Sequence, residues 1–178
     1  MNNLLKIIGL GVILPANTAF ANNRLSIEWY QWMLSIPPYY NPMFDNSGEK
    51  CAIGQHGSVW FLADDWSGSP ATTRPCSIPA GKTVYFPVMS TVYFDAPNVC
   101  GQGPDNISVN VMYALNASFI AGVANLSVEI DGKAIKELQH VRSKVFAITL
   151  PEDNIFDVSC ADAGLGDVPG GIYSAGSE

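Results

Sequence analysis

Residues 58–63 read Ser-Val-Trp-Phe-Leu-Ala, a short apolar run that is rich in β-branched and aromatic side chains. Polar, turn-rich segments lie on both sides of it, so the run has the length and the flanks of a buried β-strand. Neighbouring residues of a strand point to opposite faces. We therefore expect Trp60 and Phe61 on opposite faces, with one of the two open to solvent.

Further strand patterns follow along the chain. Residues 83–93 are β-prone but contain Pro87, which indicates an edge position, a bulge or a bend. Residues 126–130 alternate apolar and polar side chains and run into Asp131-Gly132, a hairpin-type turn. Residues 145–150 form another β-prone run.

Two stretches predict helices. Residues 24–36 carry apolar side chains at spacings of four, three and four, which places them on one helical face: Leu25, Trp29, Trp32 and Ile36. Residues 108–121 predict a second helix, with Asn106 or Ser108 as its N-cap. The pattern groups these side chains on one side of the helix: Val111, Leu115, Ser118 and Gly122, with Met112, Phe119 and Val123 adjacent to them.

These elements suit one domain of mainly β (α+β) class over residues 22–178. We expect a β-sandwich or jelly-roll-like core with an N-terminal amphipathic helix and one further helix. The composition agrees, since 16 Gly and 12 Pro with only 14% charged residues are typical of a turn-rich protein. A helical bundle rich in Glu and Lys is disfavoured on the same grounds.

Residues 1–21 have the features of a signal peptide. Lys6 supplies the positive charge, an apolar run ends at Pro15, and Ala19-Phe20-Ala21 forms a small-x-small cleavage site. An uncleaved membrane anchor is the alternative, but the apolar run is shorter than the roughly 20 residues that span a bilayer. We therefore expect a secreted or periplasmic protein that begins near Asn22. Loss of Lys6 would change the formal charge from −7 to −8, which disfavours a nucleic-acid partner.

The four cysteines favour two disulfides, because an exported chain folds in an oxidising compartment. Three pairings are possible. We favour Cys51–Cys76 with Cys100–Cys160, because the first closes a short loop between neighbouring strands. A structural zinc site is the competing interpretation, but the chain has no Cys-x2-Cys pair.

Several short motifs are spaced along residues 29–132. They are Trp29-Tyr30-Gln31-Trp32, Ser35-Ile36-Pro37, Asn41-Pro42, Asp45, Cys51, Gly54-Gln55, Gly57-Ser58-Val59-Trp60-Phe61-Leu62, Cys76-Ser77-Ile78-Pro79-Ala80-Gly81-Lys82, Phe86-Pro87 and Asp131-Gly132. Together they resemble a family of uncharacterised exported bacterial proteins. The resemblance implies no activity and no role for His56. It does imply a longer chain, with further strands after residues 171–174, so we expect an open sheet edge or a gap in the core near Ile172.

Loop residues supply the candidates for ligand binding. Trp66 follows Asp64 and Asp65 in a polar loop, where an indole can stack on a sugar ring while carboxylates accept its hydroxyl bonds. Tyr39 and Tyr40 form a second aromatic pair. The alternatives are aromatic rings that pack the loops onto the sheet and acids that are only solvated.

Metal and catalytic signals are sparser. Asp153 and Asp157 are the candidates for a calcium site, although no segment has EF-hand spacing, and no other cofactor is predicted. No Gly-x-Ser-x-Gly elbow occurs, which disfavours a Ser-His hydrolase. Asp64, Asp65 and Asp95 follow predicted strands and could form a glycosidase pair, which needs two carboxyls roughly 5–10 Å apart.

The sequence therefore favours a non-enzymatic binding module for a polysaccharide or another envelope component. A secreted glycan hydrolase that uses loop carboxylates is the first alternative. A protein-interaction module that uses an exposed strand edge is the second.

Overall fold

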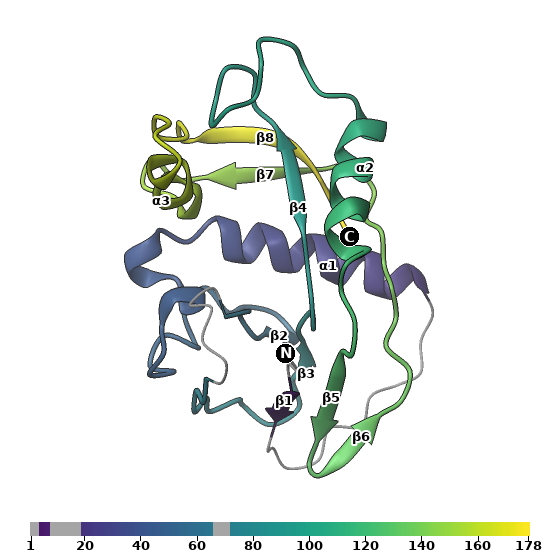
Figure 1. Ribbon diagram of the computed structural model, residues 1–178. Helices are drawn as coiled ribbons and strands as arrows, with labels where there is room; N and C mark the ends of the chain where they lie inside the picture. Colours follow the sequence, from purple (N-terminus) through teal and green to yellow (C-terminus); the bar gives the residue numbers. More distant parts are fainter. Residues whose placement is uncertain (1–3, 8–18, 66–71) are drawn as a thin grey trace.

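The computed structural model describes residues 4–7, 19–65 and 72–178 (Figure 1). Its helices are α1 (Ala19–Leu34), η1 (Pro38–Tyr40), η2 (Pro42–Phe44), α2 (Val109–Ile120) and α3 (Ile155–Asp162). Its strands are β1 (Leu4–Ile7), β2 (Val59–Phe61), β3 (Thr83–Tyr85), β4 (Val92–Asp95), β5 (Ser127–Ile130), β6 (Lys133–Ile135), β7 (Phe146–Leu150) and β8 (Gly171–Ser177).

The strands form three small sheets within the described residues. One has the order β4-β8-β7 and is antiparallel throughout. The second is the parallel pair β2 and β3, and the third has the order β1-β5-β6. The fold is thus mixed α and β, which confirms the coarser part of the predicted class. The sandwich or jelly-roll arrangement stays a prediction.

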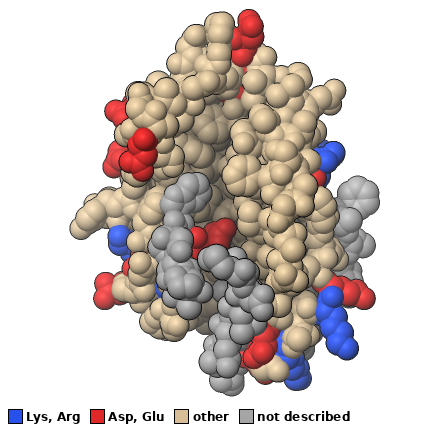
Figure 2. Space-filling model, in the orientation of Figure 1, with Lys and Arg blue, Asp and Glu red and all other residues tan. Residues whose placement is uncertain are grey.

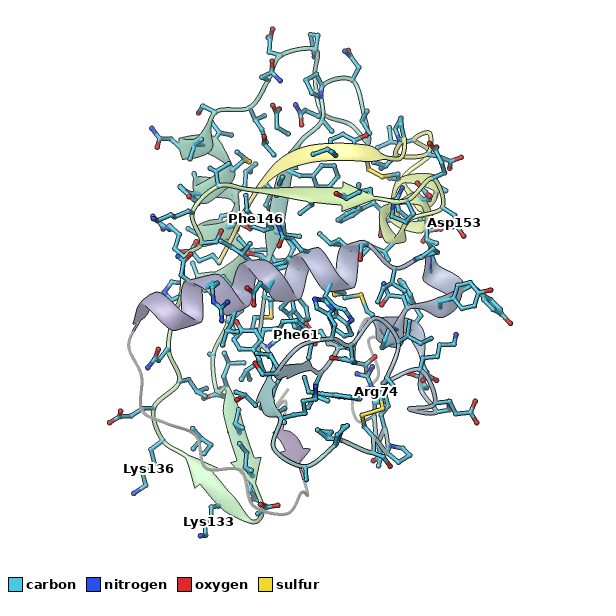
Figure 3. All side chains as sticks on the ribbon, turned by 180° about the vertical axis from the view of Figure 1, so that it is seen from behind. Phe61, Arg74, Lys133, Lys136, Phe146 and Asp153 are labelled. Atoms are coloured by element: carbon cyan, nitrogen blue, oxygen red, sulfur yellow. A yellow bond between two sulfur atoms is a disulfide. The ribbon has the colours of Figure 1, made fainter. Side chains whose placement is uncertain are left out.

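Helix α1 is the central element. It lies between the β4-β8-β7 sheet and the β2-β3 pair (Figure 1), and Phe146 of β7 and Phe61 of β2 lie on opposite sides of it (Figure 3). Two residues of the predicted face, Trp29 and Trp32, are buried on the helix, whereas Leu25 is half-buried. Ile36 is also buried but lies two residues beyond the end of the helix, which is predicted to reach it. The helix buries further side chains because sheets pack on two of its sides: Tyr30, Met33 and Leu34.

The same packing corrects the prediction for the first strand. Trp60 and Phe61 are both buried, at 6% and 5% exposure, so neither is open to solvent.

Two other predictions concern single short segments. Pro87 interrupts the predicted strand over residues 83–93, which divides into β3 and β4 in different sheets. The Asp131-Gly132 turn is confirmed between β5 and β6, with φ of 51° and 76° at its two residues, as a type I′ turn requires.

Helix α2 is confirmed in place. Ser108 caps it, since its Oγ accepts a hydrogen bond from the amide of Val111. The buried positions are Met112 and Asn116, whereas Val111 and Leu115 are exposed. Asn116 is fully buried because its amide donates to the carbonyl of Gly176 (2.8 Å) and its Oδ1 accepts from Thr91 Oγ1 (2.7 Å).

Helix α3 is an element that the sequence reasoning missed. Asn154 caps it, and the Asp157 carboxylate accepts a hydrogen bond from the Asn154 amide (2.9 Å) in a capping box. Among the described residues there is thus one α-helix more than the two predicted. The predicted strand at Ile172 is β8, which lies in the middle of its sheet.

Both disulfides have the predicted pairing. Cys51 and Cys76 join the loops before β2 and β3, with Cα atoms 5.8 Å apart. Cys100 and Cys160 join the segment after β4 to α3, with Cα atoms 5.3 Å apart.

Candidate functional site

The parallel pair β2 and β3 determines where the candidate acids lie. Parallel strands end at the same edge of a sheet, and ligands often bind beyond such carboxyl ends. Asp64 and Asp65 follow β2 at this edge, and Tyr85 is the last residue of β3. Trp29 Nε1 donates to the carbonyl of Leu62 (2.8 Å), so α1 is fastened to the same edge.

Asp64 is half-buried here, and its environment raises the pKa of its carboxyl. Burial is the main cause, and the neighbouring charge of Asp65 adds to it. The Asp65 amide, which donates to Asp64 Oδ1 (2.8 Å), and the Arg74 guanidinium act in the opposite direction without cancelling the effect. A carboxyl that is held closer to its neutral form can donate as well as accept hydrogen bonds.

Arg74 joins the two predicted loops, and the sequence reasoning did not single it out. Its Nη1 donates to the carbonyl of Pro42 (2.9 Å), and its Nη2 donates to the carbonyl of Ala63 (3.4 Å). The first contact holds the η1–η2 loop, and the second holds the chain just before Asp64. The sequence did contain a signal for the role of Arg74, because it is the only basic residue in residues 64–81, the stretch that begins with Asp64 and Asp65.

Tyr39 and Tyr40 are exposed, at 73% and 55%. Their rings meet edge to face with centroids 4.9 Å apart. Lys50 Nζ lies 5.0 Å from the centroid of the Tyr39 ring and donates to the Tyr39 carbonyl. The alternative, that these rings pack the loop onto a sheet, is wrong for both tyrosines.

The loop that carries this pair is rigidly anchored. Asn41 is fully buried, and its amide donates to the carbonyls of Met33 (2.8 Å) and Ile36 (3.0 Å) at the end of α1. Its Oδ1 accepts from the amide of Met43 (3.0 Å), which caps η2. We call Tyr39, Tyr40 and Lys50 the aromatic platform.

A surface pocket of about 390 Å³ lies around the Cys51–Cys76 disulfide. Its lining residues are Gly48, Glu49, Cys51, Ala52, Pro75, Cys76 and Ser77. Lys50 stands between these residues in the chain and contacts Tyr39, so the pocket adjoins the aromatic platform.

Trp66 lies outside the described residues. Asp64 and Asp65 are the last described residues before it, and Thr72 Oγ1 donates to Asp65 Oδ2 on the far side of the gap. Figure 2 shows a hollow near the centre of this face, with acidic atoms inside it.

Asp95 is not part of this group. Its carboxylate accepts hydrogen bonds from Gln102 Nε2 (2.9 Å), from the amide of Ile107 (2.9 Å) and from Asn106 Nδ2 (2.7 Å). Burial works to raise the pKa of Asp95, but these three hydrogen bonds outweigh it and lower the pKa. The residue therefore holds the loop after β4, and its carboxylate oxygens are already in use.

The calcium candidates are also apart from the site. Asp157 uses its carboxylate to accept from the amides of Asn154 (2.9 Å) and Val168 (2.8 Å). Asp153 is exposed near α3, on the other side of α1 from Arg74 (Figure 3). Within the part of the chain that the structure describes, no group of three or more His, Cys, Asp or Glu residues could hold a metal ion.

Asp64 and Asp95 should respond oppositely to the same substitution. The pKa of Asp64 is raised above its ordinary 3.8, so ionised Asp64 destabilises the fold as the pH rises from 3.8 through the folded pKa. The pKa of Asp95 is lowered, so ionised Asp95 stabilises the fold above 3.8, and this contribution is lost as the pH falls through the folded pKa. At neutral pH we expect Asp64→Asn to raise the melting temperature and Asp95→Asn to lower stability by about 1 kcal/mol.

Thermal melts of the two variants and the unmodified protein, recorded from acid to neutral pH, measure both effects. The difference for Asp64→Asn should shrink as the pH falls through the folded pKa of Asp64 towards 3.8, whereas the difference for Asp95→Asn should shrink only as the pH falls below 3.8 through the folded pKa of Asp95. A loss of stability with Asp64→Asn at neutral pH would show that Asp64 is a structural acid like Asp95.

Comparisons with models of protein families, with curated proteins and with solved structures found no match to this chain. The geometry of the aromatic platform and of the acids beyond β2 is therefore the basis for a functional conclusion.

Proposed function

We propose that this chain is an exported protein that binds a polysaccharide or another envelope component through the aromatic platform. The observation that carries the proposal is the exposure of Tyr39 and Tyr40, at 73% and 55%, on an anchored loop. Exposed aromatic rings bury large areas when a ligand covers them, and their hydroxyls supply hydrogen bonds at the same time. Sugar rings present both an apolar face and hydroxyls, so they match this surface.

The anchoring of the loop supports the same function. Buried Asn41 and the Arg74 contact to Pro42 hold the chain at the start of η2, directly after Tyr40, and Pro37 and Pro38 restrict it before Tyr39. A ligand that binds to a preorganised surface loses less free energy to the ordering of that surface. The rings are therefore held in position although they contribute little to the core.

One further observation supports export. The chain has two disulfides, which form and persist in oxidising compartments. No helix in residues 4–7, 19–65 and 72–178 is long and apolar enough to cross a membrane.

Cleavage after Ala21 would remove β1, the partner of β5. The edge of β5 would then be open, which favours the alternative of a protein-interaction module.

Replacing both Tyr39 and Tyr40 with alanine should weaken glycan binding by roughly 30-fold. Truncation of aromatic residues at the centre of a binding surface typically costs about 2 kcal/mol, and that figure converts to this ratio. The measurement is calorimetric titration of a glycan first found in a thermal-melt panel of soluble polysaccharides and cell-wall fragments. A ligand at about 100 times its dissociation constant should stabilise the protein by roughly 2.7 kcal/mol, which shifts the melt by several degrees.

Ile172→Ala is the matched control, because Ile172 is 76% exposed and lies on β8 rather than on the η1–η2 loop. It should leave the affinity unchanged. Equal losses in both variants would mean that the effect is not specific to the platform. A glycan that binds the double tyrosine variant with full affinity would overturn the proposal.

The raised pKa of Asp64 favours a second candidate, a hydrolase in which Asp64 is the general acid. Asp65 is the neighbouring carboxyl, whereas Asp95 is engaged by Gln102, Asn106 and Ile107. Release of new reducing ends from a bound glycan, abolished by Asp64→Asn with binding retained, would move the conclusion to this function. Binding without turnover would leave the binding protein as the better account.

A further inference from the structure

Strand β5 has a partner on each side in the structure. β6 pairs with it antiparallel, and β1 pairs with it parallel, from Leu4 opposite Ser127 to Ile7 opposite Ile130. Figure 1 shows this small sheet at the lower end of the molecule, with β1 beside β5. The pairing therefore shows which kind of strand fits the edge of β5 that β6 leaves free.

β1 is the strand that export would remove. It lies within residues 1–21, which have the features of a signal peptide. When the chain is cut after Ala21, the backbone N–H and C=O groups of β5 that point toward β1 lose their partners. The remaining hairpin of β5 and β6 has two strands, and two strands alone are only marginally stable in water. Export therefore leaves an edge that gains stability when another strand occupies it.

The register of β1 on β5 defines the apolar positions of a strand that fits this edge. Val128 is only 3% exposed with β1 in place, and Leu5 stands opposite it. Two residues further on, and therefore on the same face of the sheet, Ile7 stands opposite Ile130. A strand that takes the place of β1 therefore needs apolar residues at these two positions.

Glu129 gives the same edge a preference for one charge. It is half-buried on β5 between the two apolar positions, and the register places Lys6 opposite it. Opposite charges at facing positions of neighbouring strands stabilise a sheet, and like charges destabilise it. A strand that fits therefore has the pattern apolar-basic-apolar.

The processed chain does not contain this pattern. No Lys or Arg in residues 22–178 stands between two residues of the types Leu, Ile, Val, Met or Phe, whereas Lys6 stands between Leu5 and Ile7. A second copy of the processed chain therefore cannot supply the matching strand, and the strand has to come from a different protein.

We propose that the edge of β5 is a docking site for an extended apolar-basic-apolar segment of another exported protein, which adds as a parallel strand in the place of β1. Main-chain hydrogen bonds supply the affinity, and the alternate side chains supply the specificity. In the uncleaved chain β1 covers this edge, so docking begins only after cleavage. The inference rests on the export in the proposed function but not on its glycan ligand.

The test uses the exported chain and a fluorescent peptide with the sequence of residues 2–9, Asn-Asn-Leu-Leu-Lys-Ile-Ile-Gly. Mass spectrometry first locates the N-terminus of the exported chain. A chain that begins near Asn22 should bind the peptide, as measured by fluorescence polarisation. Recovery of a chain that keeps residues 1–21 would overturn the inference, because its edge stays covered.

Two methylated peptides test the main-chain hydrogen bonds. One carries methyl groups on the peptide nitrogens of Leu4 and Lys6, and the other on those of Leu5 and Ile7. In a strand at the edge of a sheet, only one of these two sets of N–H groups faces the neighbouring strand. One peptide should therefore bind about 30-fold more weakly, the effect of two lost hydrogen bonds, and the other should bind as before.

A charge exchange tests the register. A peptide with Lys6→Glu should bind about 5-fold more weakly, because it places two acids opposite each other. Glu129→Lys in the protein should restore the binding of this peptide and weaken that of the original one. Glu137→Lys is the matched control, since Glu137 is an exposed acid beyond β6, and it should leave the affinity for both peptides unchanged.

Each other outcome contradicts the inference. Absence of peptide binding, equal affinities of the two methylated peptides, or no recovery with Glu129→Lys would overturn it. Self-association of the processed chain that the peptide displaces would identify a second copy as the occupant and would overturn it as well. The double alanine variant of Tyr39 and Tyr40 should bind the peptide with full affinity, so failure of the docking site leaves the proposed glycan binding in place.

Discussion

Replacing Trp29 with alanine is expected to lower the free energy of unfolding by about 5 kcal/mol. Trp29 is 1% exposed at the centre of α1, so truncation leaves a large cavity between the sheets. The carbonyl of Leu62 also loses its donor, which adds to the effect of the cavity. For a chain of this length the melting temperature should fall by roughly 10–20 °C, measured by thermal and urea denaturation.

Two variants separate the causes of this effect. Trp29→Phe keeps an aromatic ring in the cavity but cannot donate to Leu62, so it should lose roughly half as much stability. Phe119→Ala removes a ring that is 60% exposed on α2, and it should change stability by no more than about 0.5 kcal/mol. If Trp29→Ala were as mild as Phe119→Ala, α1 would not be the centre of the core.

Removal of the Cys100–Cys160 disulfide should have the next largest effect, about 4 kcal/mol, when both cysteines are replaced with alanine. The bridge spans 60 residues of sequence and ties α3 to the segment after β4. On the chain-entropy model, a cross-link that closes a long loop removes more freedom from the unfolded chain. Denaturation midpoints of the oxidised protein and of the double variant measure the difference.

The Cys51–Cys76 pair is the natural comparison, because it spans 25 residues and should contribute about 3.5 kcal/mol. The reduced protein, melted in the presence of a phosphine reductant, should lose more stability than either double variant. A larger effect for the shorter loop would show that native-state strain or residual structure, rather than loop length, determines the contribution of each bridge.

Local features of the sequence predicted local structure well. The α1 stripe, the Ser108 cap and the Asp131-Gly132 turn depend on residues within about one helical turn or one hairpin of each other, so the pattern contains the relevant interactions. The cysteine pairing was also predicted, because compartment and loop length limited the alternatives.

The orientation of α2 depended on distant residues. The sequence pattern grouped Val111 and Leu115 on one side with Met112 adjacent, but the buried residues of the helix are Met112 and the polar Asn116. Its burial is possible because Thr91 and Gly176 satisfy its amide, and these lie 25 and 60 residues away in the chain. Periodicity of hydrophobic residues cannot reveal a polar side chain that finds its partners in other elements.

Helix α3 was missed although a local signal exists. Asn154 and Asp157 have the spacing of a capping box, but the sequence reasoning treated Asp157 as a calcium candidate. The helix is short, at 8 residues, and its burial of Ile155 and Cys160 depends on the disulfide and on Val168. Short helices of this kind are stabilised mainly by tertiary contacts.

The sequence by itself determined the positions of the long helices, the hairpin turn, the cysteine pairing and the set of loop acids and tyrosines from which the candidate site is drawn. Only the tertiary structure distinguished Asp64 from Asp95, two acids that occupy the same kind of position next to a strand. Asp64 is half-buried beside another acid, whereas Asp95 is surrounded by donors from the loop that it holds. A pKa depends on the solvent and the groups that surround a side chain, and for a folded chain the tertiary packing determines both.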